Sequence, residues 1–578
     1  MDSNRPWCSS YPEGVGCEAR SLPHTNLGQL VRAAAGRYGD RKAATMVLPN
    51  GMEASFTFRD INRLSEAFAA YLKDGLGLAP GTRVAILLPN SLAYPVCAFG
   101  VLKAGCVVVN TNPLYTPREL EHQLRDSGAE VLVILDMFGS KLAGVLERTR
   151  VRTVLRTGIA DFFRFGPRML IRGKLRLARK VPRFPVPATP LPRALRQGLL
   201  YLAKERLMHA PLPEPGREDL ALLQYTGGTT GLSKGAMLTH GNLLANLEQI
   251  AEITRDYVGY GGETLLTVLP LYHVLAFTIN LLFAFHAGNH NILIPNPRPL
   301  KNLRAAFRGH RITWMTAVNT LLKALPAEPW FQPSLTEGLW AVFAGGMGTH
   351  PDVRETWERT TGSIVIEGYG LTEASPLVTF NAATREGPRL RRTMTQVGGV
   401  GLALPGTDLR LVDAEGRDLP FGAHGEILVK GPQVMQGYWQ QPEETARVLR
   451  EGWLHTGDIG RMDADGYLEV TDRKKDMIIV SGFNVFPNEV EACIALHPDV
   501  ADVAVIGVPD EDCGESVHAH VVSRRHGLTA EEIRAHCRKL MAGYKIPSRI
   551  HFRSEIPKNA VGKALRRLLR KDHPPKDA

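Results

Sequence analysis

The sequence predicts an α/β protein: a large N-terminal α/β domain with several subdomains, one of them β-rich, and a small α+β domain at the C-terminus. Apolar segments with strand and helix periodicity alternate over residues 30–135 and again over 219–380, a pattern typical of a parallel sheet with helices on both faces. Short strands between Gly and Pro turns then dominate over residues 381–472. We therefore expect two domains, residues 1–475 and 476–578.

The first alternating series contains clear helices and strands. Residues 25–39 and 94–105 carry apolar residues at helical spacing, and the second of these helices is expected to end at Gly105. Short apolar strands are expected at 82–90, 107–113 and 130–136.

The last hundred residues show a separate pattern of strands and helices. A helix is expected near 488–497, and a second helix begins with the capping box formed by Thr529 and Glu532. Strands are expected at 477–482, 500–508, 516–523 and 549–553.

The net charge of +11 is concentrated in one segment, which we call the basic arm (residues 162–206). Twelve of the 69 Lys and Arg residues lie in the arm with a single acid, Glu205, so the rest of the chain is neutral. A basic arm on a neutral body favours contact with an anionic membrane surface and argues against nucleic acid as a partner. The alternative is that the arm packs on the protein.

Two further features bear on the cellular compartment. The cysteines are scattered, and no C-x-x-C is present, which predicts reduced thiols in a cytosolic protein. Residues 264–297 contain no charged Asp, Glu, Lys or Arg, but prolines, asparagines and histidines interrupt them, so we expect buried core beside a cavity and no membrane span.

The most specific local signal is the glycine-rich segment YTGGTTGLSKG at residues 225–235. An apolar strand, 220–225, leads into it, and a helix is expected to start near Asn242. Glycines allow backbone N–H groups to converge on a phosphate, and Lys234 adds a positive charge. The spacing differs from that of the G-x-x-x-x-G-K-[ST] loop, so phosphoryl transfer of that type is not predicted.

This loop resembles the phosphate loop of the adenylate-forming enzymes, which comprise acyl-CoA synthetases, luciferases and adenylation domains. Further segments similar to the family's motifs follow in its order. They are LPLYHVLAF (269–277), EGYGLTEASPLV (367–378), GWLHTGDIG (452–460), DRKKDMIIVSGFNVFPNEVE (472–491) and PKNAVGK (557–563). The residues of the loop and of segment 472–491 most resemble those of bacterial long-chain fatty acyl-CoA ligases.

The resemblance implies a set of nucleotide-binding and catalytic residues. Thr226 and Glu373 would hold Mg²⁺ against the phosphates, Lys563 would reach between the substrate carboxylate and the α-phosphate, and His273 would stand at the mouth of the acyl pocket. The ATP or AMP site implied comprises Thr226, Gly227, Gly228, Thr229, Thr230, Gly231, Lys234, Gly345, Gly346, Met347, Tyr369, Gly370, Thr372, Asp458 and Arg473.

The resemblance also implies a mobile C-terminal domain and an acyl pocket. The hinge would lie at Lys475, and rotation would bring the backbone near Gly482 to the pantetheine thiol. Val274 and Phe277 would form one wall of the acyl pocket, facing Ala317 and Val318. Ala317 stands where many long-chain relatives have Gly, which leaves the preferred chain length open.

The predicted activity is therefore that of an AMP-forming fatty acid–CoA ligase acting on a medium- or long-chain acid. Its substrates would be the fatty acid, ATP and coenzyme A, with Mg²⁺ as cofactor. Alternatives are an acyl-AMP ligase that loads a carrier protein, and a non-catalytic fatty-acid-binding or signalling protein on the same fold. We expect a cytoplasmic protein, peripheral on the cytoplasmic face of the membrane; monomer and homodimer are both left open.

Overall fold

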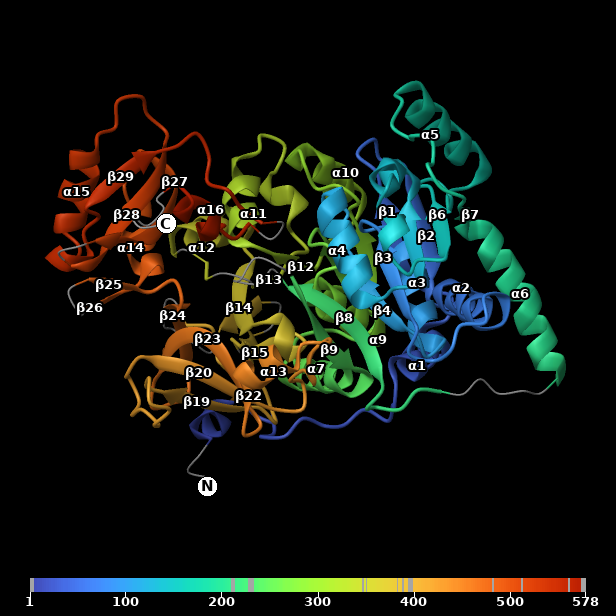
Figure 1. The fold of residues 1–578 in the computed structure, drawn as a ribbon, viewed down its shortest axis with the longest axis horizontal. Helices are drawn as coiled ribbons and strands as arrows, with labels where there is room; N and C mark the ends of the chain where they lie inside the picture. The colour runs from blue at the N-terminus through green and yellow to red at the C-terminus, as the bar shows by residue number, and fades with distance from the viewer. Residues whose placement is uncertain are drawn as a thin grey trace.

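The computed structural model describes residues 5–208, 214–226, 233–345, 348–349, 351–381, 383–386, 389–392, 399–480, 483–510, 513–559 and 562–572. Two large sheets stand side by side in the N-terminal part, and a smaller β-rich sheet lies below them (Figure 1). The C-terminal residues form a sheet of their own at one end of the molecule. The α/β prediction is confirmed.

The first large sheet has eight strands in the order β21-β9-β8-β4-β3-β5-β6-β7. Along β3, Val84 and Ile86 pack on the α3 side, whereas Ala85 and Leu87 pack on the α4 side, because successive side chains of a strand point to opposite faces. The elements are β3 (Arg83–Leu87), α3 (Ala93–Lys103), β4 (Val107–Asn110), α4 (Pro117–Ser127), β5 (Val131–Leu135), β6 (Thr153–Thr157), β7 (Thr189–Pro190), β8 (Leu220–Thr226), β9 (Lys234–Thr239) and β21 (Gly437–Tyr438).

The second large sheet has nine strands in the order β18-β15-β14-β13-β12-β10-β11-β1-β2. Helix α7 (His240–Ile253) and the π-helix η5 (Phe277–Phe283) cover one face, and α10 (Arg304–Gly309) and α12 (Pro351–Thr361) cover the other. The strands are β1 (Lys42–Val47), β2 (Glu53–Thr57), β10 (Thr264–Thr267), β11 (His290–Leu293), β12 (Trp314–Ala317), β13 (Ala341–Ala344), β14 (Ile364–Gly370), β15 (Leu377–Phe380) and β18 (Leu402–Ala403).

The β-rich part is a twisted antiparallel sheet that follows the second large sheet in the chain. Strand β23 is central, pairing with β20, β22 and β24. Its elements are β19 (Asp408–Val412), β20 (Gly425–Lys430), α13 (Pro442–Val448), β22 (Leu449–Arg450), β23 (Trp453–Met462) and β24 (Leu468–Arg473); a separate hairpin is formed by β16 (Ala383–Glu386) and β17 (Arg389–Arg392).

The C-terminal part is a five-stranded sheet with helices packed on it. The predicted capping box is present: Thr529 Oγ1 accepts from the Glu532 N–H, and Glu532 accepts from the Thr529 N–H. The elements are β25 (Ile478–Val480), β26 (Phe483–Val485), α14 (Pro487–Ala495), β27 (Val500–Asp510), β28 (Gly514–Ser523), α15 (Ala530–Arg538), β29 (Arg549–Phe552) and α16 (Arg566–Arg570).

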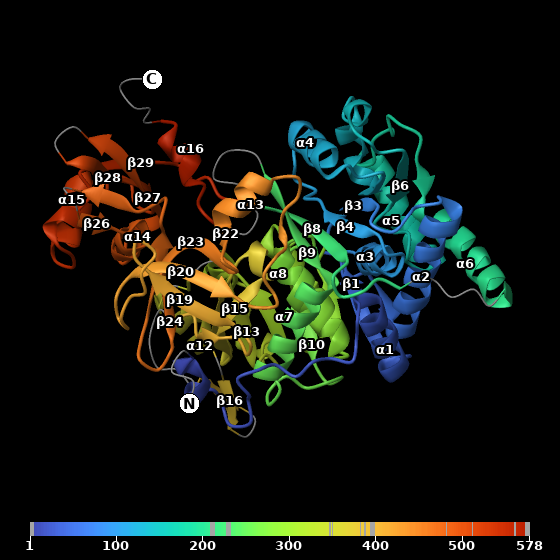
Figure 2. The ribbon, with the colours of Figure 1, turned by 60° about the horizontal axis from the view of Figure 1, so that its bottom comes forward.

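The basic arm forms two helices at the end of the molecule opposite the C-terminal sheet (Figure 1). Helix α5 (Phe165–Leu177) buries Ile171 in the hydrophobic cluster on one face of the first sheet, and α6 (Leu191–Met208) packs against α2 (Phe58–Ala70) (Figure 2). The proline-rich residues 181–190 between them contain no helix.

The uncharged segment 264–297 folds inside the N-terminal part, as expected. It runs from β10 through α8 (Val274–Ala276), η5 and α9 (Ala284–His286) to β11. Two of its buried asparagines have partners inside the protein: Asn280 donates to Thr267 Oγ1 at 2.9 Å and accepts from Thr316 Oγ1 at 3.0 Å, and Asn291 donates to the Asn280 carbonyl at 2.6 Å. Within the described residues, none of the helices has the length and apolar character needed to cross a bilayer.

One expectation is wrong at the N-terminus. Cys8 and Cys17 form a disulfide, whereas the other five cysteines are free thiols. The chain turns back between them, where the Val15 N–H donates to the Pro12 carbonyl, and their Cα atoms come within 5.3 Å. The two cysteines are nine positions apart in the sequence, and this spacing carried no recognisable signal.

Candidate active site

The phosphate-loop segment is the connection between two antiparallel strands. Thr226 ends β8 and is the register partner of Lys234, the first residue of β9. Lys234 forms an ion pair with Glu444 of α13, and its Nζ lies 5.3 Å from the centroid of the Tyr438 ring. The predicted residues Gly227, Gly228, Thr229, Thr230 and Gly231 lie outside the described part of the chain.

The carboxylate of Glu373 lies next to this hairpin. Glu373 is in the short helix η9 (Thr372–Ala374), which packs against β9. The Tyr438 hydroxyl donates a 2.8 Å hydrogen bond to Glu373 Oε1, and the Met435 N–H donates to the Glu373 carbonyl at 2.8 Å. Tertiary structure therefore brings Thr226, Lys234 and Glu373 to neighbouring elements.

The predicted ribose carboxylate, Asp458, is held from two sides. It lies on β23 with 5 % of its surface exposed. Tyr369, on β14, donates to Asp458 Oδ2 at 2.8 Å, and Arg473 Nε, on β24, lies 3.1 Å from Oδ1. Burial, followed by the charge of Asp458, raises the pKa of Tyr369, so its hydroxyl remains a proton donor.

The glycines predicted in the ATP or AMP site, outside the phosphate loop, have different structural requirements. A Cβ added at Gly370 would lie 2.1 Å from the Pro376 carbonyl oxygen, so only glycine allows this close backbone approach. A Cβ at Gly345 would lie 3.6 Å from Leu275, which is ordinary contact. Gly346 and Met347 lie outside the described residues.

Lys563 enters this site from the C-terminal sheet. Its backbone N–H donates to Asn559 Oδ1 at 2.8 Å, and the preceding residue, Gly562, packs against Thr320 of α11 (Asn319–Ala324). Burial lowers the pKa of Lys563 to about 8; the nearby Arg473 lowers it further, and Asp458 opposes the shift. These causes place the Lys563 ammonium among the groups that line the predicted nucleotide site.

Carboxylates and cations of the predicted site thus lie on neighbouring elements, and the sequence comparisons identify the family. The family model "AMP-binding enzyme" matches residues 31–439, and "AMP-binding enzyme C-terminal domain" matches residues 489–563.

The chain belongs to the AMP-binding enzyme family.

Curated relatives in this family match nearly the whole chain. The long-chain-fatty-acid–CoA ligase of Salmonella typhimurium is 44% identical over 566 residues, covering 98% of this chain and 97% of the relative. The protein of the same name from Bacillus subtilis is 38% identical, with 98% coverage of both chains. Feruloyl-CoA synthase from an Amycolatopsis species is 34% identical, covering 91% of this chain and 96% of the relative.

Solved structures share the whole fold. The anthranilate CoA ligase AuaEII in complex with anthranoyl-AMP has a TM-score of 0.80 at 25% identity, covering 96% of this chain and 98% of that one. MatB from Rhodopseudomonas palustris, at 28% identity with 95% and 99% coverage, has a TM-score of 0.77 with ATP bound and 0.69 as the apo form. The predicted adenylate-forming family is thus confirmed.

The predicted hinge lies between the two parts of this AMP-binding enzyme. Lys475 is exposed and falls between the end of β24 at Arg473 and the start of β25 at Ile478. Beside it, Arg566 is 8 % exposed and contacts Glu491 at 2.8 Å and Asp476 at 3.3 Å. Gly482 lies outside the described residues.

The predicted acyl-pocket residues are not all in one place. Val274 and Phe277 are fully buried in one hydrophobic cluster, and Val318 packs against that cluster. Ala317 belongs to a different cluster, on the α10 and α12 face of the second sheet. The side chain of the preceding residue, Thr316, points to the opposite face of β12 and contacts Asn280 of η5.

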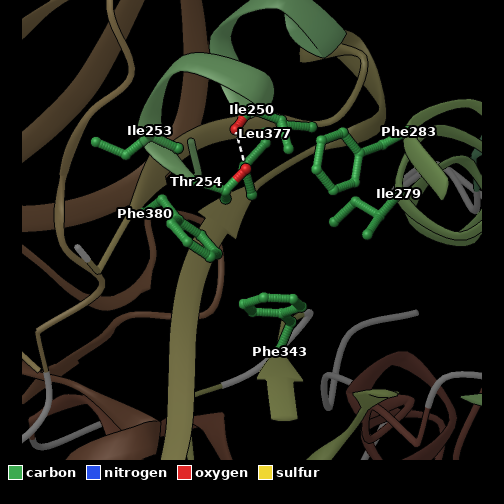
Figure 3. A pocket seen from close by; sticks show the side chains of 8 residues that line it. All are labelled: Ile250, Ile253, Thr254, Ile279, Phe283, Phe343, Leu377 and Phe380. Carbon is green, nitrogen blue, oxygen red and sulfur yellow. Dashed lines mark hydrogen bonds between the residues drawn. The ribbon is translucent and has the colours of Figure 1, made fainter. Parts of the chain in front are cut away.

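A small apolar pocket lies instead on the η5 face of the sheet (Figure 3). Ile279 and Phe283 of η5 point toward Phe343 and Phe380 across it. Phe343 and Gly345 are two residues apart on β13 and its extension, so both face this side. The pocket is lined by Ile250, Ile253, Thr254, Ile279, Phe283, Phe343, Leu377 and Phe380.

His273 is uncharged in this structure at neutral pH. It caps α8, its Nδ1 accepting from the Leu275 N–H at 3.4 Å, and burial lowers its pKa to about 4. A neutral imidazole at the predicted pocket mouth would contribute hydrogen bonding and shape but no positive charge.

Sequence reasoning missed two side chains that contact predicted site residues and a third that lies beside the predicted hinge. Tyr438 and Glu444 contact Glu373 and Lys234, and Arg566 organises the hinge-side carboxylates. The segment GYWQQPEET (437–445) combines aromatic and acidic residues, but nothing in its spacing connects it to a glutamate 65 residues earlier.

Proposed function

We propose that the chain activates a fatty acid with ATP as the acyl adenylate, releasing pyrophosphate, and then transfers the acyl group to coenzyme A, giving acyl-CoA and AMP. The observation that carries this proposal is the position of Lys563. Lys563 lies between β29 and α16, and its ammonium is near enough to Asp458 and Arg473 for their charges to shift its pKa; a positive charge is needed there as carboxylate and α-phosphate approach. The full-length likeness to long-chain-fatty-acid–CoA ligases supports the fatty acid as substrate.

The side chains divide the adenylation step between binding and charge compensation. Asp458 accepts hydrogen bonds from the ribose hydroxyls. Lys234 leaves its ion pair with Glu444 when the nucleotide binds and then compensates the charge of the phosphates. Lys563 stabilises the negative charge that develops between the attacking carboxylate and the α-phosphate. Thr372 contacts the α-phosphate, and Tyr369 packs against the adenine.

The donors at Thr226 and Glu373 fit Mg²⁺. Both supply hard oxygen atoms, and Mg²⁺ is usually held by one or two protein oxygens together with substrate phosphates. Mg²⁺ bound there would neutralise phosphate charge and help pyrophosphate to leave.

The acyl chain is proposed to extend from Gly345 along β13 into the pocket of Figure 3. Leu275, which contacts the Gly345 position, also packs against the cluster that contains the pocket residues. Ile279, Phe283 and Phe343 would then contact the distal methylenes. Transfer to coenzyme A follows rotation of the C-terminal domain about Lys475, which withdraws Lys563.

A pyrophosphate-release screen tests the proposal, with carboxylic acids of graded chain length, with and without coenzyme A. We expect release with fatty acids and formation of acyl-CoA when free coenzyme A is added. Stable acyl-AMP that free coenzyme A does not consume would indicate an enzyme that loads a carrier protein. Failure to release pyrophosphate with any acid would indicate a binding protein.

We also propose that the basic arm holds the enzyme at an anionic membrane on the cytoplasmic side. The alternative, an arm whose apolar residues are buried, does not describe α5. Ile171 is buried and Leu175 half-buried, whereas the exposed fractions are 72 % for Phe165, 51 % for Met169, 59 % for Leu170 and 87 % for Leu177.

Exposed bases accompany these apolar side chains. Arg164, Lys174, Arg176, Arg179 and Lys180 are all exposed. Apolar residues that enter the headgroup region next to cations that meet anionic lipid are the signature of an interfacial helix. Each base near such a surface contributes about 1 kcal/mol, and the site would give access to acids dissolved in the bilayer.

Co-sedimentation with vesicles of anionic or neutral lipid tests the arm. Replacing Phe165, Met169 and Leu177 with Ser should release the protein from anionic vesicles, whereas Phe421→Ser, which removes an exposed aromatic elsewhere, should not. Wild-type protein that stays in the supernatant at low salt would overturn the membrane proposal. Loss of a dimer in sedimentation velocity on the same triple replacement would assign the apolar face to self-association.

A further inference from the structure

The segment from Met435 to Trp439 connects the two elements that carry Glu373 and Lys234. At one end, the Met435 N–H donates to the Glu373 carbonyl at 2.8 Å. Further along, the Gln436 N–H donates to Met237 at 3.0 Å, and the Trp439 N–H donates to Gly235 at 2.8 Å, next to Lys234 on β9. The segment therefore holds η9 and β9 at a fixed separation.

Tyr438, in the middle of this segment, contacts both charged side chains. Its hydroxyl donates to Glu373 Oε1 at 2.8 Å, and its ring centroid lies 5.3 Å from Lys234 Nζ. Tyr438 is 9 % exposed, and its N–H donates to Thr445 Oγ1 at 2.9 Å, beside Glu444.

We propose that Tyr438 is a positioning residue that orients Glu373 and Lys234 together for Mg²⁺ and the triphosphate. A hydrogen bond from its hydroxyl fixes one carboxylate oxygen of Glu373, so that the other oxygen would be available to the metal. A cation–π interaction with its aromatic face holds the lysine ammonium. Glu373 and Lys234 are both long side chains with several rotatable bonds, and Lys234 also forms an ion pair with Glu444. One rigid residue that contacts both reduces the ordering required when the nucleotide binds.

The proposal rests on the proposed adenylation and predicts an effect confined to that half-reaction. Tyr438→Phe keeps the ring and loses only the hydroxyl. In fatty-acid-dependent ATP–pyrophosphate exchange, we expect the Mg²⁺ concentration for half-maximal rate to rise about tenfold, the typical scale for losing a hydrogen bond to a charged group. Thioester formation from supplied acyl-AMP and coenzyme A, which uses no triphosphate, should be unchanged.

Two further variants separate positioning from general damage. Tyr438→Phe combined with Glu373→Gln should be no worse than Glu373→Gln alone, because the hydroxyl acts through that carboxylate. Tyr438→Leu also removes the aromatic face and should raise the KM for ATP beyond the value for Tyr438→Phe. Tyr11→Phe, which removes a hydroxyl bonded to the Ala403 carbonyl, serves as the matched control.

An unchanged Mg²⁺ dependence in Tyr438→Phe, or effects that simply add to those of Glu373→Gln, would overturn the proposal. Equal losses in both half-reactions would also overturn it, because they would indicate a structural role. Failure of the wild-type protein to exchange pyrophosphate with any fatty acid would instead contradict the proposed function itself.

Discussion

Tyr369 and Asp458 are joined by a 2.8 Å hydrogen bond between a strand of the second large sheet and a strand of the β-rich part. Arg473 holds the other oxygen of the same carboxylate. A carboxylate held by one hydrogen bond and one ion pair keeps its orientation before any nucleotide arrives, which lowers the ordering cost of binding. The charges of Asp458 and Arg473 also act on the ammonium of Lys563 in the C-terminal part of the chain.

Lys563→Ala should damage only the first half-reaction. The ammonium is needed while carboxylate and phosphate approach each other, and losing one preorganised electrostatic contact costs roughly 10²–10³ in rate. We expect this loss in pyrophosphate exchange, with thioester formation from supplied acyl-AMP retained. Similar losses in both assays would remove Lys563 from the assigned role.

The lowered pKa of Lys563 predicts a basic limb in the pH profile of adenylation. The side chain is charged below about pH 8 and loses its proton above it, so kcat/KM, which reports the free enzyme, should fall as pH rises through that value. The measurement is pyrophosphate exchange at subsaturating ATP. A kcat/KM that stays constant up to the ordinary lysine pKa of 10.5 would contradict the lowered pKa of Lys563.

Glu373→Gln should raise the Mg²⁺ requirement of adenylation, because a neutral amide is a weaker ligand for a hard cation than a carboxylate. Titration of Mg²⁺ at fixed ATP in the exchange assay measures the change. Retention of the wild-type Mg²⁺ curve would show that Glu373 is not a metal ligand.

Ile279→Trp should shift the preference toward shorter acids by filling the pocket of Figure 3. Each methylene excluded from an apolar site costs about 0.8 kcal/mol, so losing two or three contacts would lower kcat/KM for long acids by tens of fold. Phe343→Ala should have the opposite effect. Identical chain-length profiles in wild type and both variants would place the acyl chain elsewhere.

Arg566→Met should destabilise the C-terminal sheet by about 3 kcal/mol or more, because buried carboxylates lose their counter-ion. Arg566 lies among Asp472, Asp476 and Glu491. Denaturant unfolding combined with limited proteolysis reports the change, and Arg567→Met, at an exposed neighbour, is the control. Matching unfolding curves for the two variants would refute a stabilising role for this cluster.

Local sequence patterns were sufficient to predict many of the helices and strands and the residue types that they carry. The buried strand at 131–135, the helix that ends before Gly105 and the capping box at Thr529 were all predictable, because strand alternation, glycine and capping residues act over a few positions. Ala317 shows the limit of such reasoning. A one-residue difference along β12 decides whether Thr316 or Ala317 faces η5, and motif spacing does not specify that orientation.

By itself, the sequence determined the α/β class, the family and the residue types available for adenylation, because these depend on periodicity and on motifs within short segments. Only the tertiary structure decided that Tyr438 contacts Glu373, that Cys8 bonds Cys17 and that one face of α5 remains uncovered. The contact of Tyr438 with Glu373 depends on which distant segments meet. The order of strands in the sheets sets such meetings: it brings β21 to β9 and β8 to β4, across chain separations that no local pattern records.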